Sequence, residues 1–141
     1  MKAAILTNFN NPLIIEDLQI PKLKCGQVLV KIWSSGICGA QLGQIQGTKM
    51  QKEFLPCLMG HEGGGEVIDV GDGVTTVKVG DRVVVHWRRG SGIESSFPIY
   101  EMLDGTKIGS GLVTTFNEMT IASENRVTKI DDDIPYEIAA L

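Results

Sequence analysis

The sequence has little of what marks disulfide-rich, membrane-spanning or nucleic-acid-binding proteins. Its three cysteines, Cys25, Cys38 and Cys57, are odd in number and have no paired spacing, which argues against a disulfide framework. No apolar run approaches the roughly 20 residues that a membrane span requires. The 13 basic and 17 acidic residues are scattered, so there is no basic stripe for nucleic acid. We therefore expect reduced thiols and no nucleic-acid or membrane partner.

The N-terminus also lacks the features of a secretory signal. One basic residue and a short apolar stretch open the chain, but Asn8, Asn10 and Asn11 interrupt it before a signal core could form. The segment is typical of a first strand in a cytoplasmic protein. A length of 141 residues fits one domain with a real core.

Short β-rich runs bounded by Gly, Pro, Asn or Asp recur along the chain, and 17 glycines punctuate it. The runs are Ala3–Leu6, Leu13–Ile20, Val28–Trp33, Glu66–Val70, Arg82–Trp87, Leu112–Ile121 and Arg126–Ile130. Between them, Cys38–Gln46 is predicted to be a short helix. The pattern predicts a mainly β fold, a small and partly open β-barrel with short helices.

The segment from Ile134 to Leu141 is typical of the start of a helix. Pro135 suits its first turn, and the acidic run Asp131 to Asp133 offers candidates for an N-cap. A helix this short is marginal in water by itself. We therefore expect the natural polypeptide to continue.

The candidate chemistry lies in Cys38, His61 and Glu62. His61 and Glu62 supply a nitrogen and an oxygen suited to zinc, and the thiolate of Cys38 could add a third ligand. The alternative is structural: a lone cysteine is usually a small buried hydrophobe, and a His–Glu pair is often a satisfied polar pair. Since 23 positions separate Cys38 from His61, no local motif decides between the two.

A resemblance favours the metal. The stretch from Gly60 to Val74 is similar to the zinc-containing alcohol dehydrogenase signature, whose fixed positions are met by Gly60, His61, Glu62, Gly65, Gly71 and Val74. Ser35–Gly39 resembles the segment that holds the first zinc ligand, and segments up to Pro135 resemble the end of the same domain. The similarity covers nearly the whole chain.

Membership of the medium-chain dehydrogenase/reductase family implies that residues 1–141 form a GroES-like catalytic domain, and that a Rossmann domain binding NAD or NADP lies outside this chain. It implies Cys38 and His61 as zinc ligands, Glu62 as a nearby or alternating ligand, and another ligand beyond Leu141. It implies a small alcohol or aldehyde-type substrate. The isolated chain is expected to bind zinc weakly and not to turn over, and a homo-oligomer is left open.

Three positions depart from the family near the zinc cysteine. Ala40 stands where a Ser or Thr hydroxyl usually starts the proton relay, and Gly43 where a His often extends it. Gln41 stands where an Asp usually orients the zinc-bound histidine. A Gln carbonyl could accept from His61, but it would raise the basicity of the ring less than a carboxylate. The proton must leave through water or another side chain.

The stretch from His86 to Tyr100 departs as well, because many relatives carry a four-cysteine zinc lobe there and this stretch has no cysteine. The lobe must be held by packing or be mobile. His86 is predicted to be a strand-end histidine at the core edge, with a substrate-cleft role as the alternative. The two tryptophans are predicted to be core residues, Cys25 and Cys57 structural, and Arg88–Arg89 solvated.

Three functions compete. The first is a zinc-dependent alcohol dehydrogenase-type oxidoreductase domain. The second is a zinc-free reductase-like relative, against which Cys38, His61 and Glu62 argue. The third is a non-catalytic GroES-like binding or assembly module, because fold alone does not assign function.

Overall fold

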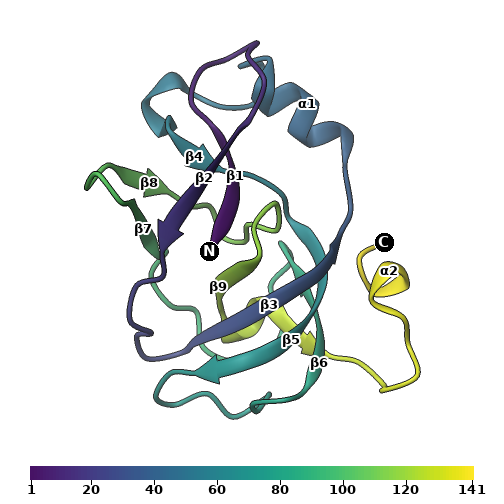
Figure 1. Cartoon of the computed structure of the whole chain (residues 1–141). Coiled ribbons are helices and arrows are strands. Elements are labelled where there is room, and N and C mark those ends of the chain that lie inside the picture. Colours follow the sequence, from purple (N-terminus) through teal and green to yellow (C-terminus); the bar gives the residue numbers. More distant parts are fainter.

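The computed structural model describes residues 1–141 as ten strands and four short helices (Figure 1). Five strands close into a barrel in the order β1-β2-β7-β8-β4: β1 (Lys2–Leu6), β2 (Ile14–Gln19), β7 (Ile99–Met102), β8 (Lys107–Gly109) and β4 (Cys57–Leu58). The other five form a sheet in the order β10-β6-β5-β3-β9: β10 (Val127–Lys129), β6 (Arg82–His86), β5 (Glu62–Val70), β3 (Gln27–Ser35) and β9 (Met119–Ser123). The prediction of a mainly β fold with a small barrel and short helices is confirmed.

The helices are α1 (Gly39–Ile45), α2 (Tyr136–Ala139) and the 3-10 turns η1 (Lys52–Phe54) and η2 (Glu124–Arg126). In Figure 1, α1 follows the long strand β3 towards the barrel strands β1 and β4, whereas α2 lies beside β5 and β6. None of the helices has the length and apolar composition needed to cross a membrane.

The barrel core is built around Tyr100, which is fully buried. Its side chain packs with Ala3, Ile5, Leu18, Leu58, Ile108 and Ile121. The phenol oxygen accepts a hydrogen bond of 2.8 Å from the backbone N–H of Ile121 in β9, and burial raises the pKa of Tyr100 to about 12. This hydroxyl therefore adds a hydrogen bond to the apolar packing of Ile121 that joins the barrel to the open sheet.

A second core of small aliphatic side chains lies on the open sheet. Its fully buried members include Val28, Val30, Val67, Val83 and Val85. β-Branched residues of this kind suit a pleated, buried surface. The long pair formed by β3 and β5 at the centre of this sheet leads directly to the candidate ligands at its end.

Three consecutive glycines, Gly63, Gly64 and Gly65, open β5 because neighbouring groups occupy the space of a side chain. A Cβ on Gly64 would collide with the backbone oxygen of Tyr136, and one on Gly65 with that of Lys31. A Cβ on Gly63 would lie 2.9 Å from Cγ2 of Thr115. The contact between Gly64 and the backbone of Tyr136 is the place where α2 packs on the sheet.

The tail helix is anchored by contacts rather than by a side-chain cap. Its N-cap is Pro135 without a side-chain hydrogen bond, so the expectation of an aspartate cap is wrong. The guanidinium of Arg82 lies 3.8 Å from the ring centroid of Tyr136 and donates a 2.7 Å bond to the backbone oxygen of Ile134. The Tyr136 ring also stacks on Trp33. These contacts hold a helix too short to be stable alone.

Several sequence predictions needed correction. Trp33 and Trp87 are each 54% exposed, so their assignment to the core is wrong. Cys25 is exposed, whereas Cys57 is buried as predicted, and all three cysteines are free. The predicted strand Leu112–Ile121 begins only at Met119, because the backbone N–H groups of Thr115 and Phe116 both donate to Met59 instead of entering a sheet.

The segment between β6 and β7, which lacks the cysteines of a zinc lobe, is held by polar contacts. Glu124 is 1% exposed and accepts hydrogen bonds from the backbone N–H groups of Thr75, Thr76 and Ile93 at 2.6–2.8 Å. Burial would raise the pKa of Glu124, but these N–H groups outweigh it and lower the pKa to about 2. A buried, ionised carboxylate thus joins two loops.

Candidate metal centre

The three candidate ligands come from two connections that meet at the end of the open sheet. Cys38 follows β3 and is the N-cap of α1, where its sulfur accepts from the backbone N–H of Ala40 at 3.5 Å. His61 and Glu62 stand at the entry to β5, directly after Gly60, whose φ of 89° is a conformation that glycine adopts without strain. The pairing of β3 with β5 brings the two connections together.

The geometry groups all three residues. One ligand atom each of Cys38, His61 and Glu62 lies within 4.8 Å of the others, and all three residues are half-buried. His61 Nε2 lies 3.4 Å from Glu62 Oε1. The predicted ligands, 23 and 24 positions apart in the sequence, therefore share one site.

The donor set fits zinc. Sulfur, imidazole nitrogen and carboxylate oxygen are its usual ligands, at bonds of about 2.0–2.3 Å. Around a tetrahedral ion with such bonds, ligand atoms lie roughly 3.3–3.8 Å apart. The observed limit of 4.8 Å exceeds this by about 1 Å, which side-chain rotation can close.

Gln41 connects two of these residues from inside helix α1. Its side chain is buried, its Oε1 accepts from the backbone N–H of Cys38 at 2.7 Å, and its Nε2 lies 2.8 Å from His61 Nδ1. The contact with His61 was expected, but its direction is the reverse. Because the N–H of Cys38 occupies the oxygen, the amide donates to His61 rather than accepting from it.

Two cavities adjoin the centre. One of about 390 Å³ is lined by Cys38, Ala40, His61, Glu62 and Trp87. Ala40 therefore lines the site with a methyl group, at the position where the family usually has the hydroxyl of the proton relay. The other, of about 260 Å³, contains His61 and Trp87 in its wall. Its apolar lining includes Met50, Phe54, Leu58, Met59, Leu112 and Val113. No Asp, Glu, Lys or Arg lines the second cavity.

Cys57 lines the second cavity but is not part of the ligand group. Burial raises the pKa of its thiol to about 11, so it stays protonated at neutral pH. The prediction that Cys57 is structural agrees with this position.

His86 and Trp87 end β6 next to the centre. His86 is half-buried at the strand end as predicted, with its two ring nitrogens 2.9 Å from the Arg88 backbone oxygen and 2.8 Å from Thr128 Oγ1. Sequence reasoning missed Trp87 as a wall of the site. The signal lies in the register of β5 on β6, which only the structure provides: His86 pairs with Glu62, and Trp87 is the next residue.

Comparisons with known proteins identify the family of the chain. The alcohol dehydrogenase GroES-like domain family matches residues 24–132. An alcohol dehydrogenase from Geobacillus stearothermophilus is 35% identical over 144 residues, which cover 99% of this chain and 43% of that protein. The chain thus spans less than half the length of this relative.

Two solved structures share the fold. The 2R,3R-butanediol dehydrogenase of Bacillus subtilis is 32% identical with a TM-score of 0.74, over 99% of this chain and 43% of its own. The benzyl alcohol dehydrogenase of Acinetobacter calcoaceticus is 23% identical with a TM-score of 0.81, over 99% and 43%, and supports the fold alone. With its signature residues assembled at one site, the chain belongs to the alcohol dehydrogenase GroES-like domain family of the medium-chain dehydrogenase/reductases.

Proposed function

We propose that this chain is the metal-binding domain of a zinc-dependent alcohol dehydrogenase that transfers hydride between a small alcohol or aldehyde-type substrate and NAD or NADP. The observation that carries the proposal is the grouping of Cys38, His61 and Glu62 within 4.8 Å. In the proposed reaction the nucleotide is bound mainly by a Rossmann domain of the kind that the family implies.

Cys38 and His61 would hold the zinc, and Glu62 would be a third or alternating ligand. Bound zinc supplies Lewis acidity that lowers the pKa of an alcohol and stabilises the alkoxide. The protein's own part is orientation: the backbone of α1 fixes Cys38, and in the metal-free site Gln41 holds the ring of His61 through the 2.8 Å contact.

The proton of the alcohol would leave to solvent. Ala40 has no hydroxyl to receive it, and the side chains of His61 and Glu62 are 19% and 33% exposed, so water reaches the site. The second cavity, which no Asp, Glu, Lys or Arg lines, supports an uncharged substrate beside His61.

Metal analysis tests the proposal. The purified chain is loaded with Co²⁺ in place of zinc, and the thiolate-to-cobalt charge-transfer absorption is recorded together with metal stoichiometry. Cys38→Ser is expected to abolish the band, and Cys25→Ser, an exposed cysteine outside the ligand group, to leave it unchanged. Absence of a Cys38-dependent band would favour the zinc-free reductase or the binding-module alternative.

A further inference from the structure

Trp87 contributes to the walls of both cavities beside the candidate metal centre, yet core packing does not fix it. The residue is 54% exposed. The guanidinium of Arg88 lies 5.8 Å from the centroid of its ring, but Arg88 belongs to the same loop and moves with it. The position of Trp87 must therefore be set through its backbone.

The backbone oxygen of Trp87 accepts a hydrogen bond from Nη1 of Arg126. Arg126 lies in η2 and is 7% exposed. The other end of the same guanidinium, Nη2, donates to the two carboxylate oxygens of Glu94 at 3.1 and 3.0 Å. One planar group thus joins the start of the loop, at Trp87, to its middle, at Glu94.

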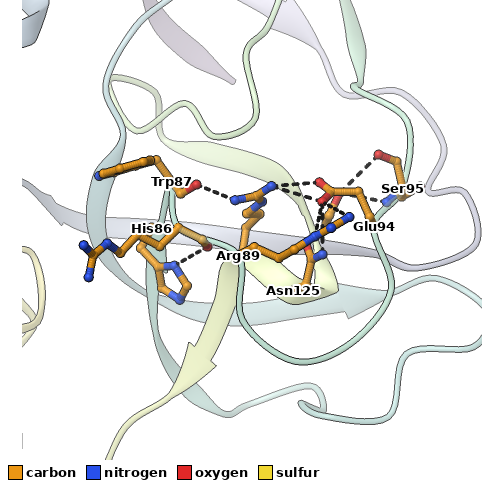
Figure 2. Close-up of polar contacts among 9 residues, drawn as sticks. His86, Trp87, Arg89, Glu94, Ser95 and Asn125 are labelled. Carbon is orange, nitrogen blue, oxygen red and sulfur yellow. Dashed lines mark hydrogen bonds and ion pairs between the residues drawn. The ribbon is translucent and has the colours of Figure 1, made fainter.

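Glu94 is in turn held by two further residues (Figure 2). Arg89 Nε donates to its Oε2 at 2.9 Å and Asn125 Nδ2 at 3.2 Å. Hydrogen bonds from Asn125 and Arg126 outweigh desolvation and lower the pKa of Glu94, so the carboxylate is charged at neutral pH. Arg126 therefore has a charged, multiply anchored partner.

The loop backbone is also fastened to the residues around η2. Gly90 N–H donates to the backbone oxygen of Asn125 at 2.7 Å, and Ser95 N–H donates to Ser123 Oγ at 3.0 Å. On the other side of Trp87, His86 is fixed by its pairing with Glu62 and lies 2.9 Å from the Arg88 backbone oxygen through its ring. Between these two anchored stretches, the bond from Arg126 is the one hydrogen bond that Trp87 itself makes.

We propose that Arg126, clamped by Glu94, is a positioning residue that sets Trp87 against Cys38 and His61 and so fixes the width of the cavity beside them. The consequence for substrate selection rests on the proposed function. The placement of Trp87 does not, because it depends only on contacts within the chain.

The test uses Trp33→Phe as background, which leaves Trp87 as the single tryptophan of the two. Arg126→Gln is expected to release the Trp87 backbone. Trp87 is 54% exposed before this substitution, so complete exposure in the Arg126→Gln variant should raise its acrylamide quenching constant by about twofold. Quenching of Trp87 by Co²⁺ bound at Cys38 should fall in the same variant, since the ring moves away from the site.

The matched control is Arg89→Gln. Arg89 also pairs with Glu94, at 2.9 Å, but makes no bond to Trp87, so both quenching measurements should stay at the starting value. Arg126→Lys should restore the starting value only in part, because one ammonium cannot reproduce the planar fork that spans Trp87 and Glu94.

Equal acrylamide quenching in Arg126→Gln and the Trp33→Phe background would overturn the proposal, as would an equal rise in Arg89→Gln. If circular dichroism shows that Arg126→Gln does not fold, Glu94→Gln takes its place and should raise quenching in the same direction. A failure of the Co²⁺ band would count against the proposed function, while the metal-free acrylamide comparison still decides the role of Arg126.

Discussion

Replacing Gln41 with glutamate should tighten metal binding, because the amide cannot satisfy both of its neighbours once a metal is bound. Coordination through Nε2 of His61 leaves the ring proton on Nδ1. That proton then faces the NH₂ of Gln41, 2.8 Å away, whose oxygen is already occupied by the N–H of Cys38 at 2.7 Å. Either orientation of the amide sets two donors against each other. A carboxylate would accept from both.

The size of the effect follows from the change at one buried contact. Gln41 is 2% exposed, so water does not reach its amide to relieve the mismatch. A partner of this kind behind a metal-bound histidine changes metal affinity by about 10–100-fold, or roughly 1.4–2.7 kcal/mol. Gln41→Glu is therefore expected to lower the Kd for zinc by at least about tenfold. Gln41→Met, which keeps the length and removes both bonds, should raise it.

Competition between the protein and a chromophoric zinc chelator at pH 7.5 measures these constants. The control is Gln44→Glu, which adds the same charge on the same helix, in the wall of the cavity that contains His61. It has no side-chain bond to either ligand and reports only the general effect of a negative charge. The reasoning is refuted if Gln41→Glu binds zinc no more tightly than Gln44→Glu.

Three further outcomes are expected. The pKa of Glu124 falls from 4.5 to about 2 on folding. Its ionised form therefore contributes roughly 3 kcal/mol to the free energy of unfolding above pH 4.5, and this contribution is lost as the pH falls towards 2. Urea unfolding of Glu124→Gln at pH 7 should show a loss of that order. Tyr100→Phe should lower the free energy of unfolding by about 1–3 kcal/mol in the same assay, because the buried N–H of Ile121 loses its acceptor, and an unchanged midpoint would contradict this. With a pKa of about 11, roughly one in a thousand Cys57 thiols is ionised at pH 8, so mass spectrometry should find iodoacetamide on exposed Cys25 and none on Cys57 until the protein unfolds.

The sequence predicted the strands with strong aliphatic patterns, and the short β10 as well, but missed β4, β7 and β8. The runs at β3 and β6 were placed correctly because each contains three β-branched valines or isoleucines. The strand β8 contains only Lys107–Gly109, and its one apolar side chain, Ile108, gives no period to detect. Its pairing with β7 and β4 arises from closure of the barrel, a long-range effect.

The prediction that the two tryptophans are core residues was wrong for a related reason. Large aromatic residues usually contribute to a core, but Trp33 and Trp87 lie at strand ends beside the centre and the tail helix. The local sequence carries no signal of that placement. The grouping of Cys38 with His61 was predicted only through the family signature, since the register of β3 on β5 cannot be derived from spacing alone.

The crowding at Gly63, Gly64 and Gly65 bears on how a mutational scan of this protein is interpreted. An alanine at Gly64 or Gly65 would collide with the backbone oxygen of Tyr136 or Lys31, and one at Gly63 would crowd the side chain of Thr115. None of the three glycines carries a functional group. Such variants are expected to disrupt the grouping of Cys38, His61 and Glu62 as completely as a change at His61 itself. Thermal melting of the metal-free protein would separate the two classes, since the glycine variants are expected to unfold at a lower temperature and a His61 variant at the starting temperature.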